Sequence, residues 1–150
     1  MLPPAHQRLH QVPDIATVPL LAVIEDFMGV PGPPGNVQFY GPSTEQYSAF
    51  VEGESVPSEL EVLGVTDTHT FRLTVGANPA ELAARAASIL QDDVMDELGA
   101  PWPELTGPLT SSTLLEPVAR DDSEGTWEGN GLRCRIGELQ QTFGHLIRPA

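Results

Sequence analysis

Four acidic side chains over residues 92–97 are the first in this sequence whose types and spacing could do chemistry. They are Asp92, Asp93, Asp96 and Glu97. Asp92 and Asp96 lie four residues apart, as do Asp93 and Glu97, so each pair shares one face of a helix. Paired carboxylates can hold a hard cation such as Mg²⁺ or serve as acid and base in hydrolysis. The alternatives are a solvated helix face and a surface for a partner, and a metal site is the least favoured of the three.

The position of this acidic cluster conflicts with helix electrostatics. Like charges four residues apart destabilise a helix by a few tenths of a kcal/mol, and the macrodipole disfavours anions at the C-terminal end. This conflict is the best indication of a function in the chain. We therefore predict a partner-binding surface made of the four acids and Trp102. Trp102 stands between two prolines and has two interpretations, a lid over the core, which is preferred, or an exposed anchor.

An alternative site is centred on His69. The histidine shares a strand face with Phe71, so a partly buried, hydrogen-bonded ring is the first interpretation. Asp67, two residues earlier, could orient the imidazole as a general base. No serine or threonine stands in a nucleophile-elbow motif. Together with the Pro/Gly-rich segment 29–36, these residues predict a pocket for a small molecule or for hydrolysis.

Three further residues lie in one predicted hairpin strand. Cys134 is on its apolar side, which indicates a buried structural thiol. Arg133 and Arg135 are the only close basic pair, and they could bind an anion or pair with the many carboxylates. The glycines match no phosphate-binding fingerprint, and we expect no cofactor and no metal.

The charge balance limits the partners. The chain of 150 residues has 21 acidic and 7 basic residues, all of the latter arginine, and a net charge of −14. Such a charge opposes binding to nucleic acids and to anionic membranes. It favours encounter with basic proteins, although acidity also serves solubility alone.

The cysteine count and the apolar segment 15–24 indicate the compartment. A single cysteine rules out a disulfide within the chain. The apolar segment is too short to span a bilayer and lacks the flanks of a signal peptide. A cytoplasmic location is the prediction.

The chain is predicted to begin with a flexible arm over residues 1–13, which is followed by a single domain over residues 14–150. Asp14 could cap a helix that ends near Met28. Pro19 would then lie inside the helix, so we prefer a later start with Thr17 as the cap and Pro19 in the first turn.

The rest of the chain alternates between strand and helix patterns. Asn78 and Pro79 open a helix that ends at Leu98, with Gly99 in the left-handed conformation. Asn130-Gly131 marks a tight hairpin turn. The remaining predictions are strands near 37–40, 47–52, 60–65, 68–75, 113–116, 126–128 and 132–136, a loop over 100–112 and a final helix over 137–147. The fold class is α+β, with a mostly antiparallel sheet of about five strands and one long helix on one face.

Several short motifs resemble those of a group of small uncharacterised actinobacterial proteins. They are the run Gln91 to Leu98, Trp102-Pro103, Thr126-Trp127, and Ile136-Gly137-Glu138-Leu139. The resemblance implies a compact bacterial module without an established activity. Where that group carries Cys and His after Trp-Pro, this chain has Glu104, Leu105 and Thr106, so a metal role implied by the resemblance has no ligands.

The function predicted from the sequence is a non-enzymatic interaction module that binds a basic protein, as immunity or antitoxin proteins do. The alternatives are a small hydrolase or small-molecule-binding domain with a pocket near His69, and a structural homodimer joined at a sheet edge.

Overall fold

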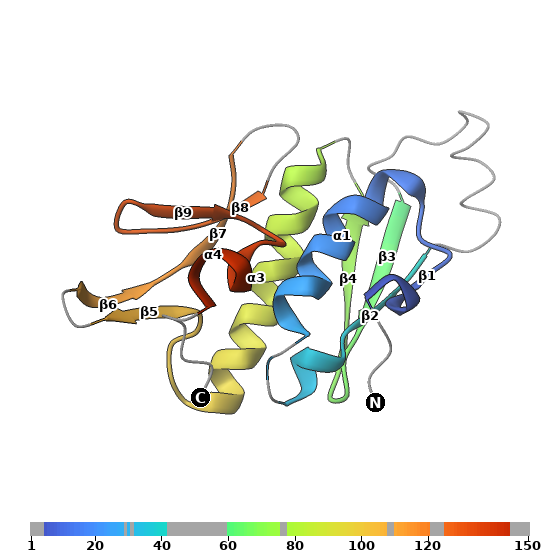
Figure 1. Cartoon of the computed structure of the whole chain (residues 1–150). Coiled ribbons are helices and arrows are strands. Elements are labelled where there is room, and N and C mark those ends of the chain that lie inside the picture. Colours follow the sequence, from blue (N-terminus) through green and yellow to red (C-terminus); the bar gives the residue numbers. More distant parts are fainter. Residues whose placement is uncertain are drawn as a thin grey trace.

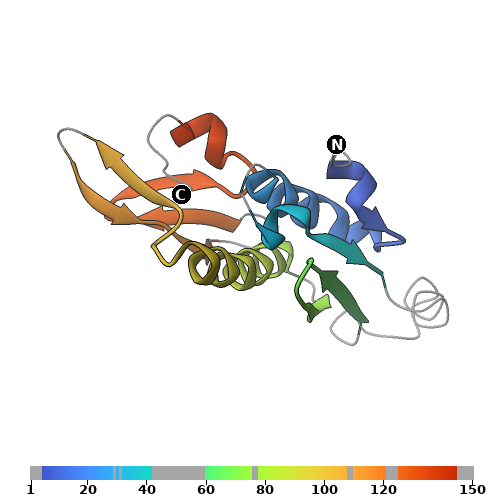
Figure 2. The ribbon, with the colours of Figure 1, turned by 90° about the horizontal axis from the view of Figure 1, so that it is seen from below.

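Two helices that lie against each other form the centre of the molecule. The computed structural model describes residues 5–28, 30, 32–41, 60–75, 78–107, 110–120 and 125–144. Helices α1 (Asp14–Phe27) and α3 (Pro79–Leu98) separate an N-terminal sheet from the C-terminal strands (Figures 1 and 2). The fold is therefore α+β, as predicted. The single sheet of about five strands is wrong, because the described strands form three small sheets and α3 shares the centre with α1.

The N-terminal sheet has the order β1-β2-β3-β4, and only β1 and β2 run parallel. Its strands are β1 (Leu9–His10), β2 (Gln38–Tyr40), β3 (Leu60–Val65) and β4 (Thr70–Val75). The alternation predicted for β4 is confirmed, since Leu73 and Val75 are buried while Arg72 and Thr74 are exposed. The strand predicted at 47–52 lies outside the described residues.

The N-terminal segment is packed against the domain from residue 5 onward, so a flexible arm over 1–13 is wrong for this part. It forms a 3-10 turn, η1 (Ala5–Arg8), and then β1. The buried guanidinium of Arg8 donates a hydrogen bond of 2.6 Å to the Gly35 carbonyl. Gly35 belongs to a second 3-10 turn, η2 (Pro33–Asn36), inside the predicted Pro/Gly loop. Tertiary contacts, which local composition does not report, hold the segment in place.

Helix α1 begins at Asp14, and Pro19 lies inside it, so the preferred start at Thr17 is wrong. The hydroxyl of Thr17 instead donates to the Pro13 carbonyl within the first turn. Pro19 removes one helical hydrogen bond. The complete burial of Leu20, Ile24 and Phe27 on the same helix offsets that loss.

Helix α3 has the predicted ends. The side-chain oxygen of Asn78 accepts hydrogen bonds from the backbone N–H groups of Ala80 (2.9 Å) and Glu81 (3.3 Å). Gly99 has a φ of 66°, and its N–H donates to the Met95 carbonyl. A residue with a side chain would be strained at this φ, so glycine fixes where the helix ends.

The C-terminal part consists of two small sheets and a short helix. Strands β5 (Glu104–Gly107) and β6 (Thr110–Leu114) pair with each other, and β5 stands where a loop over 100–112 was expected. The second sheet has the order β7 (Glu116–Ala119), β8 (Gly125–Gly129), β9 (Leu132–Arg135), followed by α4 (Leu139–Phe143). The hairpin turn between β8 and β9 is confirmed, with φ values of 50° at Asn130 and 82° at Gly131.

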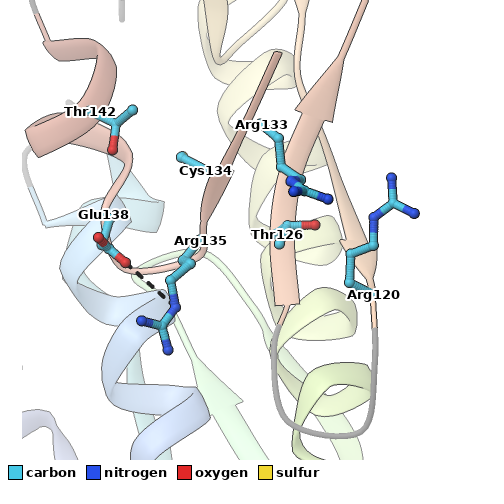
Figure 3. A pocket seen from close by; sticks show the side chains of 7 residues that line it. All are labelled: Arg120, Thr126, Arg133, Cys134, Arg135, Glu138 and Thr142. Carbon is cyan, nitrogen blue, oxygen red and sulfur yellow. Dashed lines mark ion pairs between the residues drawn. The ribbon is translucent and has the colours of Figure 1, made fainter. Parts of the chain in front are cut away.

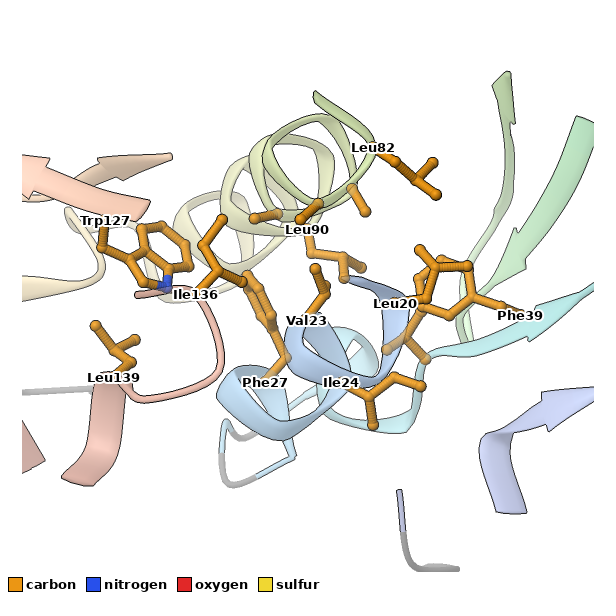
Figure 4. Close-up of a cluster of buried hydrophobic side chains, with 14 of the residues drawn as sticks. Leu20, Val23, Ile24, Phe27, Phe39, Leu82, Leu90, Trp127, Ile136 and Leu139 are labelled. Atoms are coloured by element: carbon orange, nitrogen blue, oxygen red, sulfur yellow. The ribbon is translucent and has the colours of Figure 1, made fainter. Parts of the chain in front are cut away.

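Beside the apolar cluster of the core (Figure 4), two of the buried polar side chains, Asp26 and Gln91, connect the helices to the C-terminal part. The carboxylate of Asp26 accepts from Trp127 Nε1 (2.8 Å) and from the backbone N–H groups of Gly137 (2.6 Å) and Leu139 (3.1 Å). The Gln91 amide donates to the carbonyls of Trp102 (3.1 Å) and Leu115 (2.6 Å). These bonds attach the C-terminal part to α1 and α3.

Candidate functional site

The four acids at the C-terminal end of α3, here called the acidic end, lie beside the turn between β3 and β4. Asp92, Asp96 and Glu97 are exposed, whereas Asp93 is half-buried. Glu97 lies over Gly32, where a methyl group would come within 3.0 Å of the Glu97 Cγ atom. The fold thus places three carboxylates on the surface and turns the fourth toward the N-terminal sheet.

His69 and Asp93, which the sequence assigns to two different sites, meet in the structure. The ring Nε2 atom of His69 lies 3.2 Å from Oδ2 of Asp93, without alignment for a hydrogen bond. The carboxylate of Asp67 instead accepts a hydrogen bond from the Asn36 amide, and among the described residues no hydrogen bond or ion pair joins it to His69. The expected orientation of His69 by Asp67 is therefore wrong, and a carboxylate from α3 occupies that position.

Among the described residues, the acidic end has more negative charge than neighbouring cations balance. Burial raises the pKa of Asp93, His69 lowers it, and the charges of Asp96 and Asp92 raise it again. The last turn of α3 has no basic residue. Among the described residues, Asp92, Asp96 and Glu97 form no ion pair. The acidic end is therefore a set of like charges without compensation inside the described part of the chain.

Trp102 is not available to a partner, because its side chain is completely buried. Its ring centroid lies 5.1 Å from that of Phe27 and 6.1 Å from that of Trp127. Three aromatic rings at this spacing form a core contact. The preferred interpretation as part of the core is confirmed, and Trp102 is removed from the predicted surface.

The surroundings of His69 contain two hydroxyl groups. The Nδ1 atom lies 3.5 Å from Thr66 Oγ1 and 3.4 Å from Thr68 Oγ1. With Asp93 on the other ring nitrogen, the order is carboxylate, imidazole, hydroxyl. The histidine side chain is 38% exposed, and the hollows found on the described surface are lined by other residues. In the described residues, no group of three or more His, Cys, Asp or Glu side chains could hold a metal ion.

A second charged region, which the sequence indicated only in part, lies on the outer side of the β7–β8–β9 sheet. A hollow of about 470 Å³, here called the arginine hollow, opens there between the sheet and α4 (Figure 3). It is lined by Arg120, Thr126, Arg133, Cys134, Arg135, Glu138 and Thr142. The alternation of Arg133 and Arg135 is visible in the sequence. Arg120 is a distant residue that only the pairing of β7 with β8 brings close.

Cys134 is a buried thiol, as predicted. Burial raises its pKa to about 12, and the charges of Asp26 and Glu138 act in the same direction. At neutral pH the side chain is therefore a neutral thiol, which makes it a poor nucleophile.

Comparison with known proteins gives no indication of a function for this chain. No protein-family model, no curated protein and no solved structure matches this chain. Within the described residues, no helix is both long and apolar enough to cross a membrane. The resemblance to actinobacterial proteins stays a prediction. The homodimer joined at a sheet edge also stays a prediction. Strands β4 and β9 stand at sheet edges, with one neighbour each in the described sheets.

Proposed function

We propose that this protein is an interaction module that binds a basic partner protein through the acidic end of α3. The observation that carries the proposal is a set of three exposed carboxylates, Asp92, Asp96 and Glu97. None of them forms an ion pair with a described residue. Immunity and antitoxin proteins are the functional classes that use an acidic surface in this way. The surface consists of α3 together with the adjacent β3–β4 turn.

A cationic partner would remove an unfavourable interaction that the free protein retains. Each like-charge pair four residues apart costs a few tenths of a kcal/mol, and the helix dipole adds a similar amount. Lys or Arg side chains from a partner would face these carboxylates and lower both terms. Because α3 is capped at Asn78 and ends at Gly99, the carboxylates are held on a rigid element before binding. The net charge of −14 would also accelerate encounter with a basic protein at low salt.

The test compares two variants with the same change in charge. The first carries Asp92→Asn, Asp96→Asn and Glu97→Gln, which remove three charges and keep the side-chain shapes. The control carries Asp14→Asn, Glu61→Gln and Glu81→Gln, which remove three exposed charges near the other end of α3. Each immobilised protein is incubated with lysate of the native host at low salt and eluted with a salt step. Retained proteins are identified and counted by mass spectrometry.

We expect one stoichiometric basic protein to be retained by the wild type and by the control, and to be lost with the first variant. Binding of the purified partner should then weaken steeply with salt, as expected for opposed surface charges. Equal retention by all three proteins would contradict the proposed surface. Equal loss from both variants would show that net charge alone is recognised, which also contradicts it.

A hydrolase is the second candidate, and the series Asp93, His69 and Thr68 favours it. In such a series the imidazole takes a proton from the hydroxyl while the carboxylate orients the ring. It ranks second because His69 is exposed and the hollows found on the described surface are lined by other residues. Hydrolysis of p-nitrophenyl acetate that is lost in both His69→Ala and Thr68→Val would favour it, and unchanged hydrolysis in either variant would reject it.

A further inference from the structure

Charged and hydroxyl side chains lie next to one another on the outer side of the β7–β8–β9 sheet. In the register of the strands, Thr126 pairs with Arg135, and Glu128 pairs with Arg133. Because side chains alternate along a strand, these four share one side of the sheet, while Trp127 and Cys134 point to the other. Arg120 follows β7 and reaches the same side, where its guanidinium binds the Glu128 carboxylate. The positions are thus fixed by strand pairing rather than by flexible loops.

Two of the three arginines of the arginine hollow are held by carboxylates. Arg120 donates two hydrogen bonds of 2.7 Å to Glu128, and Arg135 lies 3.6 Å from Glu138 (Figure 3). The Thr126 hydroxyl also donates to Glu128, and this bond, followed by those from Arg120, lowers the pKa of the glutamate. Arg133 is exposed, and among the described residues it forms no ion pair. Its guanidinium is therefore the donor best placed to receive a ligand.

The geometry points to a binding site for a small oxyanion, carried by a phosphate or a carboxylate group, in the arginine hollow. Three of the seven arginines of an acidic chain line this one hollow, together with Glu138, and the carboxylate of Glu128 lies next to it on Arg120. A guanidinium presents two parallel N–H groups that match the oxygens of a carboxylate or a phosphate. The site is separate from the acidic end of α3, so this inference does not rest on the proposed function.

The remaining lining residues suit an anion that is larger than a single phosphate. The volume of about 470 Å³ lies in the range of small-molecule sites. Thr142 adds an exposed hydroxyl, whereas the hydroxyl of Thr126 already donates to Glu128. Cys134, at the margin of the hollow, adds no charge because its thiol stays protonated. A neighbouring hollow of about 610 Å³ shares Arg120 and Arg133 and continues toward the hairpin turn. A ligand with two anionic groups could therefore contact Arg133 and a second guanidinium together.

The test is a titration of the ¹⁵N-labelled full chain with pyrophosphate and, separately, with citrate. Ionic strength is held constant with sodium chloride, and NMR follows the backbone amides and the arginine Nε–H groups. The variants are Arg133→Gln, Arg133→Lys and Arg72→Gln. Arg72 is the control, because it is an exposed arginine with a comparable long ion pair, 3.7 Å from Glu61, on the other sheet.

We expect saturable shifts at Thr126, Arg133 and Arg135, with dissociation constants of micromolar to millimolar order. Arg133→Gln should weaken binding about tenfold, the effect of one lost charge-assisted hydrogen bond. Arg133→Lys, which keeps the charge without the two parallel donors, should recover part of that loss. Saturation by pyrophosphate alone identifies a phosphate ligand, and saturation by citrate alone a carboxylate ligand. Non-saturating shifts, or an equal effect of Arg72→Gln, would overturn the inference.

Discussion

The two sheet regions that flank the helix pair are attached to it in different ways. The N-terminal sheet contributes apolar side chains to the core, with Phe39, Val62 and Val75 completely buried. The C-terminal part contributes apolar side chains too, but Asp26 and Gln91 also reach from the helices and hydrogen-bond its backbone and Trp127. One attachment is therefore non-directional, and the other depends on hydrogen bonds of fixed geometry.

This difference has an energetic consequence. Apolar burial contributes about 25 cal/mol per Å² and does not depend on proton concentration. Burying a carboxylate costs free energy, which its hydrogen bonds recover only in part. For Asp26, burial raises the pKa to about 6, and the charge of Glu25 acts in the same direction, even though three hydrogen-bond donors lower it. The C-terminal attachment should thus respond to pH through Asp26, and the apolar contacts of the N-terminal sheet should not.

The largest effect is expected from Phe39→Ala. The side chain is completely buried and lies 6.1 Å from Phe71, centroid to centroid. Its removal should lower the free energy of unfolding by about 4 kcal/mol. The loss should be equal at pH 7 and pH 5, measured by urea unfolding. Tyr40→Ala, on the outer side of the same strand, is the control and should cost about 1 kcal/mol. A loss that changed with pH would remove the contrast between the two regions.

A smaller effect, which depends on pH, is expected from Asp26→Asn. The pKa of Asp26 in the folded protein is about 6, above the ordinary value of 3.8 for an aspartate. The folded state therefore binds more protons between these values, and stability rises as pH falls through 6. Between pH 7 and pH 5 the gain from this group is about 1 kcal/mol. Asparagine cannot titrate, so the variant should lack this gain.

Removing any charge from this acidic protein can itself change its stability, so the Asp26 effect is read from a difference. Urea unfolding of the wild type, Asp26→Asn and Glu81→Gln is measured at pH 7, 6 and 5. Glu81 is an exposed carboxylate on α3 and controls for the general loss of charge. If the wild type and Asp26→Asn gained equal stability on acidification, Asp26 would not be the group that makes the C-terminal attachment pH-dependent.

The sequence predicts the features that depend on local interactions better than those that depend on contacts between distant residues. The alternation of β4, the cap at Asn78 and the turn at Asn130-Gly131 are local signals, and all three are confirmed. Strand β5 was missed because its residues follow two prolines and show no clear alternation. The prediction that α1 begins at Thr17 was wrong. It rests on the local preference of proline for the first turn of a helix, whereas burial of the apolar face of α1 is a property of the whole fold.

The polar contacts between distant residues carry no local signal. Asp26 bonds to Trp127, 101 positions later, and in the sequence it only marks the end of an apolar segment. The sequence indicates His69 and Asp93 as two separate candidates, but their contact needs the β3–β4 turn to lie at the end of α3. It also indicates Arg133 and Arg135 as a pair, whereas the arginine hollow needs Arg120 as well. Residue type and spacing therefore identified chemistry-bearing side chains, and the fold decided which of them meet.

The smallest effect is expected from His69→Ala, which tests the polar contact between the N-terminal sheet and α3. The two side chains are 38% and 23% exposed, so water screens the pair and its removal should cost less than about 1 kcal/mol. The variant should nevertheless raise the pKa of Asp93 further, because His69 is the group that lowers it. Carbon-detected NMR titration of the Asp93 carboxylate measures this shift, with Thr68→Val as the control that keeps the imidazole. A stability loss as large as that of Phe39→Ala would show that a polar contact also anchors the N-terminal sheet, and the contrast between the two attachments would then fail.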